Sequence, residues 1–339
     1  MNRISLFSPS LNPADSYGVV AANLSRYLTT HGVTVNALGF DKSQSGFLPA
    51  SDGAIHMGWP SMFGMFPPVD GPKIAITMWE SSKAPPSWIP ILNEMDAVIT
   101  PSTFCYDLFK AQGVTAPMYM FPLGIDPTYQ PVVRPQSDVT TFLAFMDRGR
   151  RKGGLVALHA FLLAFGDDPR YQLVLKMRKP GQQVILFDNP NIRLIQQDMS
   201  EQELYELYCS CDCMIAANKG EGFGLLPREA SASGCITLAT NWGGTADDLD
   251  LWGWPLSYQL NKADWTGQPG LDGLELGEWA NPCVDELAAM LRDVAEHKAE
   301  YLGAAQKRAG NVHQLYSWQR FGEQVFDVWR NVSGQQGRF

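Results

Sequence analysis

The chain has 339 residues, of which 45% are hydrophobic and 18% charged, so it holds enough apolar material for two ordinary globular domains. Its 26 basic and 35 acidic side chains give a formal net charge of -9, which disfavours non-specific binding to nucleic acid. Because it has no run of about 20 apolar residues, and because Pro9 and Pro13 interrupt its apolar start, we expect a cytoplasmic protein with reduced cysteines.

The first part of the chain alternates between strand-like and helical patterns. Short β-like runs lie at 3–8, 33–38, 54–58, 73–78, 96–100 and 117–121. Helical patterns at 17–31 and 102–112 stop at Gly32 and Gly113, as a glycine C-cap predicts. This alternation predicts a parallel sheet with crossover helices.

Residues 122–138 break the pattern, because they carry four prolines and no periodicity, and we interpret them as a linker between domains. A second alternating series follows. Its expected strands lie at 139–145, 171–177, 191–196, 212–217 and 235–240. Its expected helices lie at 152–165, near 200–209 and at the EGFG segment that begins at Glu221. Residues 251–281, rich in Trp and Gly, are expected to form a surface excursion, with helices at 283–309 and 317–331 after it. The fold class is therefore α/β with two doubly wound domains, whose ligands should bind beyond the carboxyl ends of the strands.

Residues 221–229, EGFGLLPRE, place two carboxylates eight positions apart around a glycine-rich turn. The segment follows an expected strand, and Pro227 suits the first turn of a helix. The N–H groups of such a loop and the helix dipole attract a phosphate or diphosphate. We interpret the two acids as grips on hydroxyl-rich groups to either side of it, and the alternative is a helix start at which the dipole alone favours acids.

Residues 147–154, DRGRRKGG, also lie between an expected strand and an expected helix. Four cationic residues fall within positions 148–152, although a helix start disfavours cations. A bound anion would offset this, so we favour diphosphate binding over a solvated charge run.

The segment CSCDC at 209–213 has the spacing C-x-C-x-C and lacks the paired spacing and partner histidines of a zinc site. The favoured interpretation is small buried residues at the end of a helix and the start of a strand. No metal site is predicted from the cysteines.

The segment EGFGLLPRE and its neighbours resemble a known family. EGFGLLPREASASGCITLATNWGGTADDL (221–249) resembles the E-x7-E region of retaining glycosyltransferases of the GT-B fold, particularly the large family four. The segments 101–102 (PS), 122–126 (PLGID), 151–165 and 316–325 (YSWQRFGEQV) are similar to further features of that family in order and spacing. The resemblance implies two Rossmann-like domains that face a central cleft. An acceptor-side domain would span 1–130 and a nucleotide-sugar domain 131–316, with the C-terminal helix 317–339 packing back on the first.

The resemblance also implies donor-binding residues. Lys152 would hold the diphosphate of a nucleotide-sugar together with an arginine. The position six before Lys152 is Met146, where the family has that arginine, so Arg148 or Arg150 would have to serve here. Gly18 would approach the diphosphate from the other domain. No metal or other cofactor is implied, since the cations and the helix start neutralise the phosphates.

The two glutamates receive different roles from the same resemblance. Glu229 would accept hydrogen bonds from the donor ribose, while Glu221 would face the transferred sugar. The backbone amides that would contact the sugar and phosphates are those of Phe223, Gly224 and Leu225.

On the acceptor side, the resemblance points to Glu80, in TMWESSK, and to His56, in AIHMGWP. For His56 the alternative is a polar residue at a strand end. The aromatic loop 57–68 would line an acceptor pocket or form part of the domain core. The family is thought to retain anomeric configuration by front-face displacement, in which the leaving diphosphate helps to take the acceptor proton.

The expected function is therefore a retaining glycosyltransferase with a nucleotide-sugar donor, for which UDP-sugars are the commonest choice among such relatives, and an unidentified hydroxyl acceptor. Four alternatives stay open: a glycosyltransferase that acts on a modified DNA base, a nucleotide-sugar epimerase, a phosphorylase of the same fold, and a non-catalytic nucleotide-sugar-binding protein. A nucleic-acid acceptor is not favoured by the negative charge. The donor sugar, its base and the oligomeric state are not specified by the sequence.

Overall fold

The computed structural model describes residues 3–12, 14–40, 50–134, 137–146, 150–178 and 188–334, which form two compact units. The first unit comprises Met1–Gly124, Trp265–Gly277 and Tyr316–Phe339. The second comprises Ile125–Asp264 and Glu278–Leu315. The chain therefore returns to the first unit twice after leaving it.

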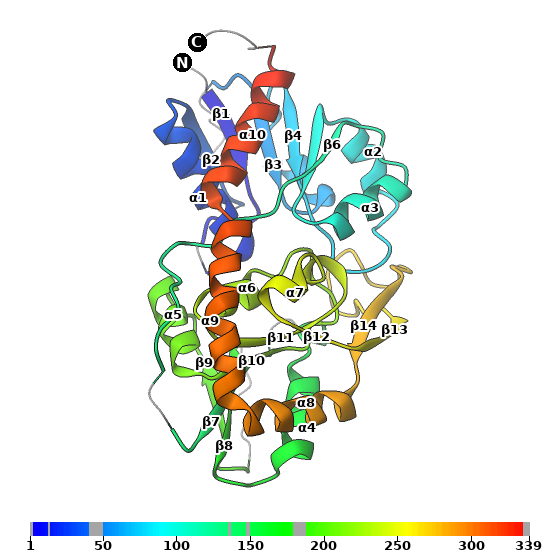
Figure 1. Cartoon of the computed structure of the whole chain (residues 1–339). Coiled ribbons are helices and arrows are strands. Elements are labelled where there is room, and N and C mark those ends of the chain that lie inside the picture. The colour runs from blue at the N-terminus through cyan, green and yellow to red at the C-terminus, as the bar shows by residue number, and fades with distance from the viewer. Residues whose placement is uncertain are drawn as a thin grey trace. The chain divides into compact units, whose positions relative to one another are not determined.

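The first unit is built on a six-stranded parallel sheet with the strand order β2-β1-β3-β4-β5-β6 (Figure 1). The strands are β1 (Arg3–Phe7), β2 (Thr34–Leu38), β3 (Ala54–Met57), β4 (Lys73–Ile76), β5 (Ala97–Thr100) and β6 (Met118–Met120). The helices are α1 (Ser16–Thr30), α2 (Trp88–Asn93), α3 (Thr103–Ala111) and α10 (Trp318–Val332), with a 3-10 turn η2 (Pro60–Met65). All six strands and both helices expected in the first part of the chain are confirmed.

The second unit has a six-stranded parallel sheet of order β12-β11-β10-β7-β8-β9 and an antiparallel ribbon of β13 and β14. The strands are β7 (Thr140–Phe145), β8 (Tyr171–Met177), β9 (Ile192–Gln196), β10 (Cys213–Ala216), β11 (Ile236–Thr240), β12 (Trp254–Leu256), β13 (Tyr258–Lys262) and β14 (Glu278–Pro282). The helices are α4 (Gly154–Phe165), α5 (Glu201–Ser210), α6 (Leu225–Ala232), α7 (Leu249–Trp252), α8 (Val284–Glu296) and α9 (Lys298–Leu315), with a 3-10 turn η3 (Gly243–Thr245). The α/β fold class with two doubly wound sheets is therefore confirmed.

Each sheet has one place where the chain reverses the direction in which strands are added. In the first unit, β2 and β3 lie on opposite sides of β1, and in the second unit β8 and β10 lie on opposite sides of β7. The loops that leave such a pair of neighbouring strands diverge, which opens a crevice at the carboxyl ends of the strands. In the second unit, these diverging loops are the one after β7, described at Met146 and at residues 150–153, and residues 217–224, after β10.

Helix starts and stops follow the chemistry of the sequence. The Asp15 side chain caps α1 by accepting from the amide of Tyr17, and Ser200 and Glu203 form a reciprocal capping box on α5. The glycines expected to stop the first two helices, Gly32 and Gly113, have φ of 78° and 98°, in the left-handed region that favours glycine.

The last helix, α10, belongs to the first unit and packs against α1. Its buried face includes Phe321, Val325 and Trp329. A Cβ atom at Gly322 would lie 2.3 Å from the Tyr27 ring, so a glycine lets the two helices approach closely here.

The segment 251–281 differs from the expected surface excursion. It contains β12, β13 and most of β14, and six of its large hydrophobic side chains are buried: Trp252, Leu256, Trp265, Leu271, Leu276 and Trp279. Residues 265–277 pack within the first unit, where the Trp265 ring stacks on Trp79 with centroids 4.5 Å apart and its Nε1 donates to Ser81 Oγ at 3.3 Å. The expectation was wrong because burial here depends on a distant partner and leaves no periodic pattern.

The single helix expected at 283–309 is two helices, α8 and α9. The break falls at His297, whose φ of -108° and ψ of 28° are not helical. Apolar periodicity continues across the break, so the sequence pattern did not reveal it.

The three cysteines of CSCDC lie as expected at the end of a helix and the start of a strand. Cys209 is in the last turn of α5, Cys211 follows it, and Cys213 begins β10. Burial raises the pKa of the Cys211 thiol to about 11, so it is protonated at neutral pH. In the described ranges, no group of three or more His, Cys, Asp or Glu side chains is placed to hold a metal ion.

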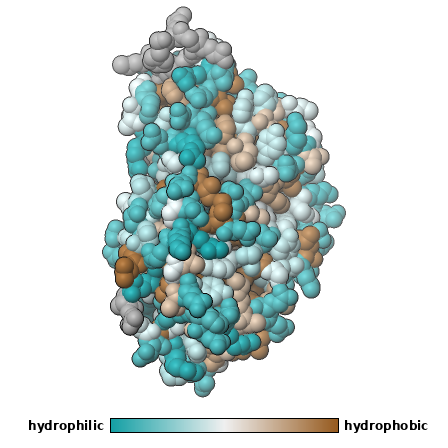
Figure 2. All heavy atoms as spheres, in the orientation of Figure 1, coloured by the Kyte–Doolittle hydropathy of each residue, from teal (hydrophilic) through white to brown (hydrophobic). Residues whose placement is uncertain are grey.

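Large hydrophobic side chains that are more than a third exposed are spread over several elements. Among the described residues they are Met65, Met120, Val133, Leu155, Leu162, Leu163, Leu251, Leu260 and Leu274. On the face drawn in Figure 2, apolar residues form small groups between hydrophilic ones. None of the helices described is both long and apolar enough to span a bilayer.

The packing of Trp265 in the first unit predicts the effect of its removal. Trp265→Ala should lower the free energy of unfolding by about 3 kcal/mol, because it removes a buried aromatic stack and leaves a cavity. Leu274→Ala is the matched control in the same segment, since its side chain is 44% exposed and its loss should cost less than about 0.5 kcal/mol. Chemical denaturation measures both values. Equal stabilities of the two variants would contradict the packing of residues 265–277.

Candidate functional site

The two loops that diverge from the reversal point of the second unit touch each other. The amide of Lys219 donates to the carbonyl of Arg151 at 2.8 Å. Gly153 has φ of 68°, and a Cβ atom there would lie 1.8 Å from the carbonyl oxygen of Ala217. Only glycine fits both the backbone conformation and the space, so Gly153 permits the contact between the loop after β7 and the loop after β10.

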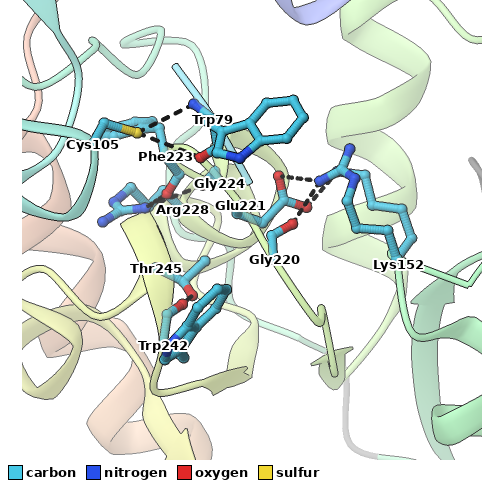
Figure 3. Close-up of polar contacts among 11 residues, drawn as sticks. Trp79, Cys105, Lys152, Gly220, Glu221, Phe223, Gly224, Arg228, Trp242 and Thr245 are labelled. Atoms are coloured by element: carbon cyan, nitrogen blue, oxygen red, sulfur yellow. Dashed lines mark hydrogen bonds and ion pairs between the residues drawn. The ribbon is translucent and has the colours of Figure 1, made fainter. Parts of the chain in front are cut away.

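A buried ion cluster joins the same two loops. Lys152 Nζ lies 2.5 Å from Glu221 Oε1, and Arg151 Nη1 lies 3.4 Å from Glu221 Oε2 (Figure 3). Arg151 also donates to the carbonyl of Gly220 at 2.6 Å. Arg151 and Glu221 are 6% and 7% exposed, so each charge needs a close partner. The carboxylate that meets the cations of the basic segment is therefore supplied by EGFGLLPRE itself.

A third loop holds residues 217–224 from the other side. The amide of Gly244, in η3 after β11, donates to the carbonyl of Glu221 at 2.7 Å. A Cβ atom at Gly244 would lie 2.2 Å from the carbonyl oxygen of Gly222. Gly244 therefore lets the loop after β11 approach the backbone of the loop after β10 closely.

The helix expected within EGFGLLPRE is α6, which begins at Leu225. Gly224 precedes it with φ of 88°, a left-handed conformation that suits glycine. Pro227 lies in the first turn, where its missing N–H removes none of the bonds within the helix. The expected amide donors Phe223, Gly224 and Leu225 therefore lie at a helix start, where N–H groups have no partner within the helix.

Glu229, the second acid, lies in a different environment from the first. It is buried on α6, and the Tyr208 hydroxyl donates to its Oε2 at 3.0 Å. Burial raises the pKa of Glu229 to about 7, although the hydrogen bond from Tyr208 opposes the shift. Burial and the neighbouring Glu229 also raise the pKa of Tyr208, so Tyr208 stays a donor.

Arg228, between Pro227 and Glu229, is fully buried, which the sequence analysis did not predict. Its guanidinium donates to four backbone carbonyls, those of Phe223, Gly224, Gly244 and Asp247. It also lies 4.1 Å from the centre of the Phe223 ring and 4.6 Å from that of Trp252. No sequence signal distinguishes it from an exposed arginine on a helix.

The basic segment resolves into residues with different surroundings. Arg148 lies outside the described residues. Arg150 is exposed and forms an ion pair with Asp264 at 2.9 Å. Arg151, which was not singled out, is the buried arginine of the ion cluster.

The expected residues of the first unit lie in or after neighbouring strands of its sheet. Gly18, in α1, comes after β1, His56 lies in β3, and Glu80 comes shortly after β4. A Cβ atom at Gly18 would lie 1.9 Å from the carbonyl oxygen of Asn12, so this glycine permits the loop after β1 to fold against α1. The role of Gly18 in donor binding stays a prediction.

His56 is buried within an aromatic cluster. Its ring lies 5.0 Å from Phe7 and 5.2 Å from Phe63, centre to centre. Burial, with a smaller effect from Lys73, lowers the pKa of His56 to about 4, so the ring is neutral at pH 7. Phe63 and Phe66 from the 57–68 loop are both buried, which places them in the domain core. Glu80 is 9% exposed, between Trp79 and Ser81.

The raised pKa of Glu229 predicts how stability changes with pH. The pKa of Glu229 is about 7 in the folded protein, above its ordinary value of 4.5. The contribution of Glu229 to folding stability is therefore fully present below pH 4.5 and is lost as the pH rises to about 7. The whole effect is about 3 kcal/mol at 1.36 kcal/mol for each pKa unit. Glu229→Gln has no carboxyl group to titrate at this position. The free energy of unfolding of the variant, relative to that of the unchanged protein, should therefore rise from pH 5 to pH 8. Thermal unfolding at both values measures this, with the exposed Glu206→Gln as control. A difference that is constant with pH would contradict it.

Comparison of the sequence with protein-family models and with curated protein sequences gives no match. The structure is similar to solved structures over nearly its whole length. A sucrose-phosphate synthase from Thermosynechococcus elongatus matches with a TM-score of 0.74 and 14% identity, over 99% of this chain and 100% of that one. Anabaena HepE in complex with UDP-glucose matches with 0.67 and 12%, over 98% and 100%. A glycosyltransferase from Rickettsia africae matches with 0.68 and 13%, over 98% of each chain. The chain therefore has the two-domain α/β GT-B fold of the glycosyltransferases to which it is similar.

Proposed function

We propose that the protein is a retaining glycosyltransferase that moves a sugar from a nucleotide diphosphate sugar to an acceptor hydroxyl. The observation that supports this most strongly is the cluster of Arg151, Lys152 and Glu221 beside the start of α6. It brings two cations and a helix N-terminus together at the reversal point of a doubly wound sheet, where such folds bind phosphates. The fold is that of structures that include a complex with UDP-glucose.

The donor is a UDP-sugar bound by the second unit. Its diphosphate lies beside Lys152 and the amides at the start of α6, whose charges and dipoles neutralise it. On binding, the diphosphate replaces Glu221 as the partner of Lys152, and the Glu221 carboxylate accepts hydrogen bonds from the sugar. Arg151 stays with Glu221 and with the carbonyl of Gly220. Donor binding of this kind needs no added metal ion, so it should continue in the presence of a chelator.

Glu229 binds the ribose of the donor. Tyr208 already donates to Oε2, so Oε1 is the atom that accepts from the ribose hydroxyls. A carboxylate accepts more strongly than a neutral acid does. Since the pKa of Glu229 is about 7, donor affinity should be greater above neutral pH than below it.

The acceptor binds to the first unit, where Glu80 orients its hydroxyl. The bond between the anomeric carbon and the diphosphate oxygen breaks as the acceptor oxygen bonds to the same face of the sugar. The acceptor proton goes to the departing diphosphate. His56 is a poor proton acceptor at neutral pH because its pKa is about 4, so we assign it a role in positioning the acceptor rather than in proton transfer.

Lys152→Ala tests the donor site directly. It should weaken UDP binding about 10- to 100-fold, since a charge-assisted contact to phosphate contributes about 1.5–3 kcal/mol. Glu221 keeps Arg151 as a partner in this variant, so the protein should still fold. Lys307→Ala, at an exposed position on α9, is the control and should bind UDP normally.

Isothermal titration calorimetry with UDP and a screen of nucleotide-sugars for hydrolysis or transfer provide the readouts. The proposed function fails if the unchanged protein binds no nucleoside diphosphate and turns over no nucleotide-sugar. Normal UDP binding by Lys152→Ala would leave the function standing and overturn the assignment of the site.

A further inference from the structure

Two arginines of the second unit each bind four backbone carbonyls, at opposite ends of the same pair of strands. Arg134 donates to the carbonyls of Tyr208, Cys211, Ser233 and Gly234. These residues precede β10 and β11, at their amino ends. Arg228 donates to carbonyls in the loops that follow β10 and β11, at the carboxyl ends where the candidate site lies.

The planar trans peptide group gives the contacts of Arg228 a directional consequence. The C=O of one residue and the N–H of the next point in opposite directions. A carbonyl of Phe223 that faces Arg228 therefore turns the amide of Gly224 away from it. In the same way, the carbonyls of Gly224 and Gly244 direct the amides of Leu225 and Thr245 away from Arg228.

Turned away from Arg228, these amides point out of the side of the loop that packs on the guanidinium. Figure 3 shows Arg228 and Lys152 on opposite sides of Glu221. The guanidinium is fully buried between the rings of Phe223 and Trp252, 4.1 and 4.6 Å from their centres, so it cannot reach a ligand in that position. Its influence on a ligand has to pass through the backbone that it holds.

We propose that Arg228 is a positioning residue for the donor diphosphate. By holding the carbonyls of two neighbouring loops inward, it presents the amides of Gly224, Leu225 and Thr245 together as one anion-binding surface. Preorganised backbone donors bind an anion without the cost of reorienting them on binding. This inference rests on the proposed function, because it takes the bound anion to be the diphosphate of the donor.

Arg134 provides the matched control, because its removal deletes the same number of carbonyl contacts without touching the loops of the site. Arg228→Met and Arg134→Met should both lower the Tm. At a temperature well below both transitions, Arg228→Met should bind UDP at least tenfold more weakly, and Arg134→Met should change the affinity less than twofold. Arg228→Lys, which keeps the charge but not the four-carbonyl geometry, should recover only part of the affinity.

A second measurement uses the unchanged protein and does not depend on the variants folding. With 15N-labelled glycine, leucine or threonine, titration with UDP should shift the amide resonances of Gly224, Leu225 and Thr245. Thr245 is the sharpest probe, because it lies on the second of the two loops that Arg228 joins.

The inference is overturned if the two methionine variants lose UDP affinity equally, or if the Thr245 amide does not respond to UDP that binds elsewhere in the second unit. It is supported if affinity falls selectively in Arg228→Met and the three amides shift together. Failure of the unchanged protein to bind UDP would be a different result, since that overturns the proposed function itself.

Discussion

The site depends on the pairing of Arg151 and Lys152 with Glu221. These charges come from two loops that are about 70 residues apart in sequence and leave neighbouring strands in opposite directions. Buried charges are costly unless they are paired, so the loops cannot separate without exposing or isolating a charge. The contact also needs Gly153, since any side chain there would meet the backbone of the other loop. Topology, a glycine and an ion cluster together bring the basic and acidic segments to one place.

The two acids of EGFGLLPRE differ because their surroundings differ. Glu221 lies against two cations, Arg151 and Lys152. Glu229 is buried beside Tyr208, and its pKa is about 7. Acids with separate environments can serve separate roles within one site. The spacing of eight residues places one acid in the loop before α6 and the other on the helix itself.

The sequence predicted most of the fold because parallel strands buried on both faces are short apolar runs, bounded by glycine or by caps. Its two candidate binding segments, DRGRRKGG and EGFGLLPRE, were predicted because they fall directly after such strands, and the family resemblance pointed to Lys152 and Glu221 within them. The sequence could not show which arginine of the basic segment is buried. Arg150 and Arg151 are adjacent and of the same type, and they differ in their partners, which are Asp264 for Arg150 and Glu221 for Arg151. Trp265 was missed for the same reason: its burial depends on Trp79, far away in the sequence.

The backbone contacts of the loop restrict how the site could accept a donor. The carbonyl of Glu221 accepts from the amide of Gly244, and the carbonyls of Phe223 and Gly224 accept from Arg228. The carbonyl of Gly220, before Glu221, accepts from Arg151, so the main chain is fixed on both sides of the Glu221 side chain. If a diphosphate is to replace Glu221 at Lys152, the change with the lowest cost is rotation of the Glu221 carboxylate about its side-chain bonds, while the loop stays in place. A donor site of this kind would be formed before the donor arrives. In the empty site Glu221 would balance the charge of Lys152, and after donor binding the same acid would bind the sugar.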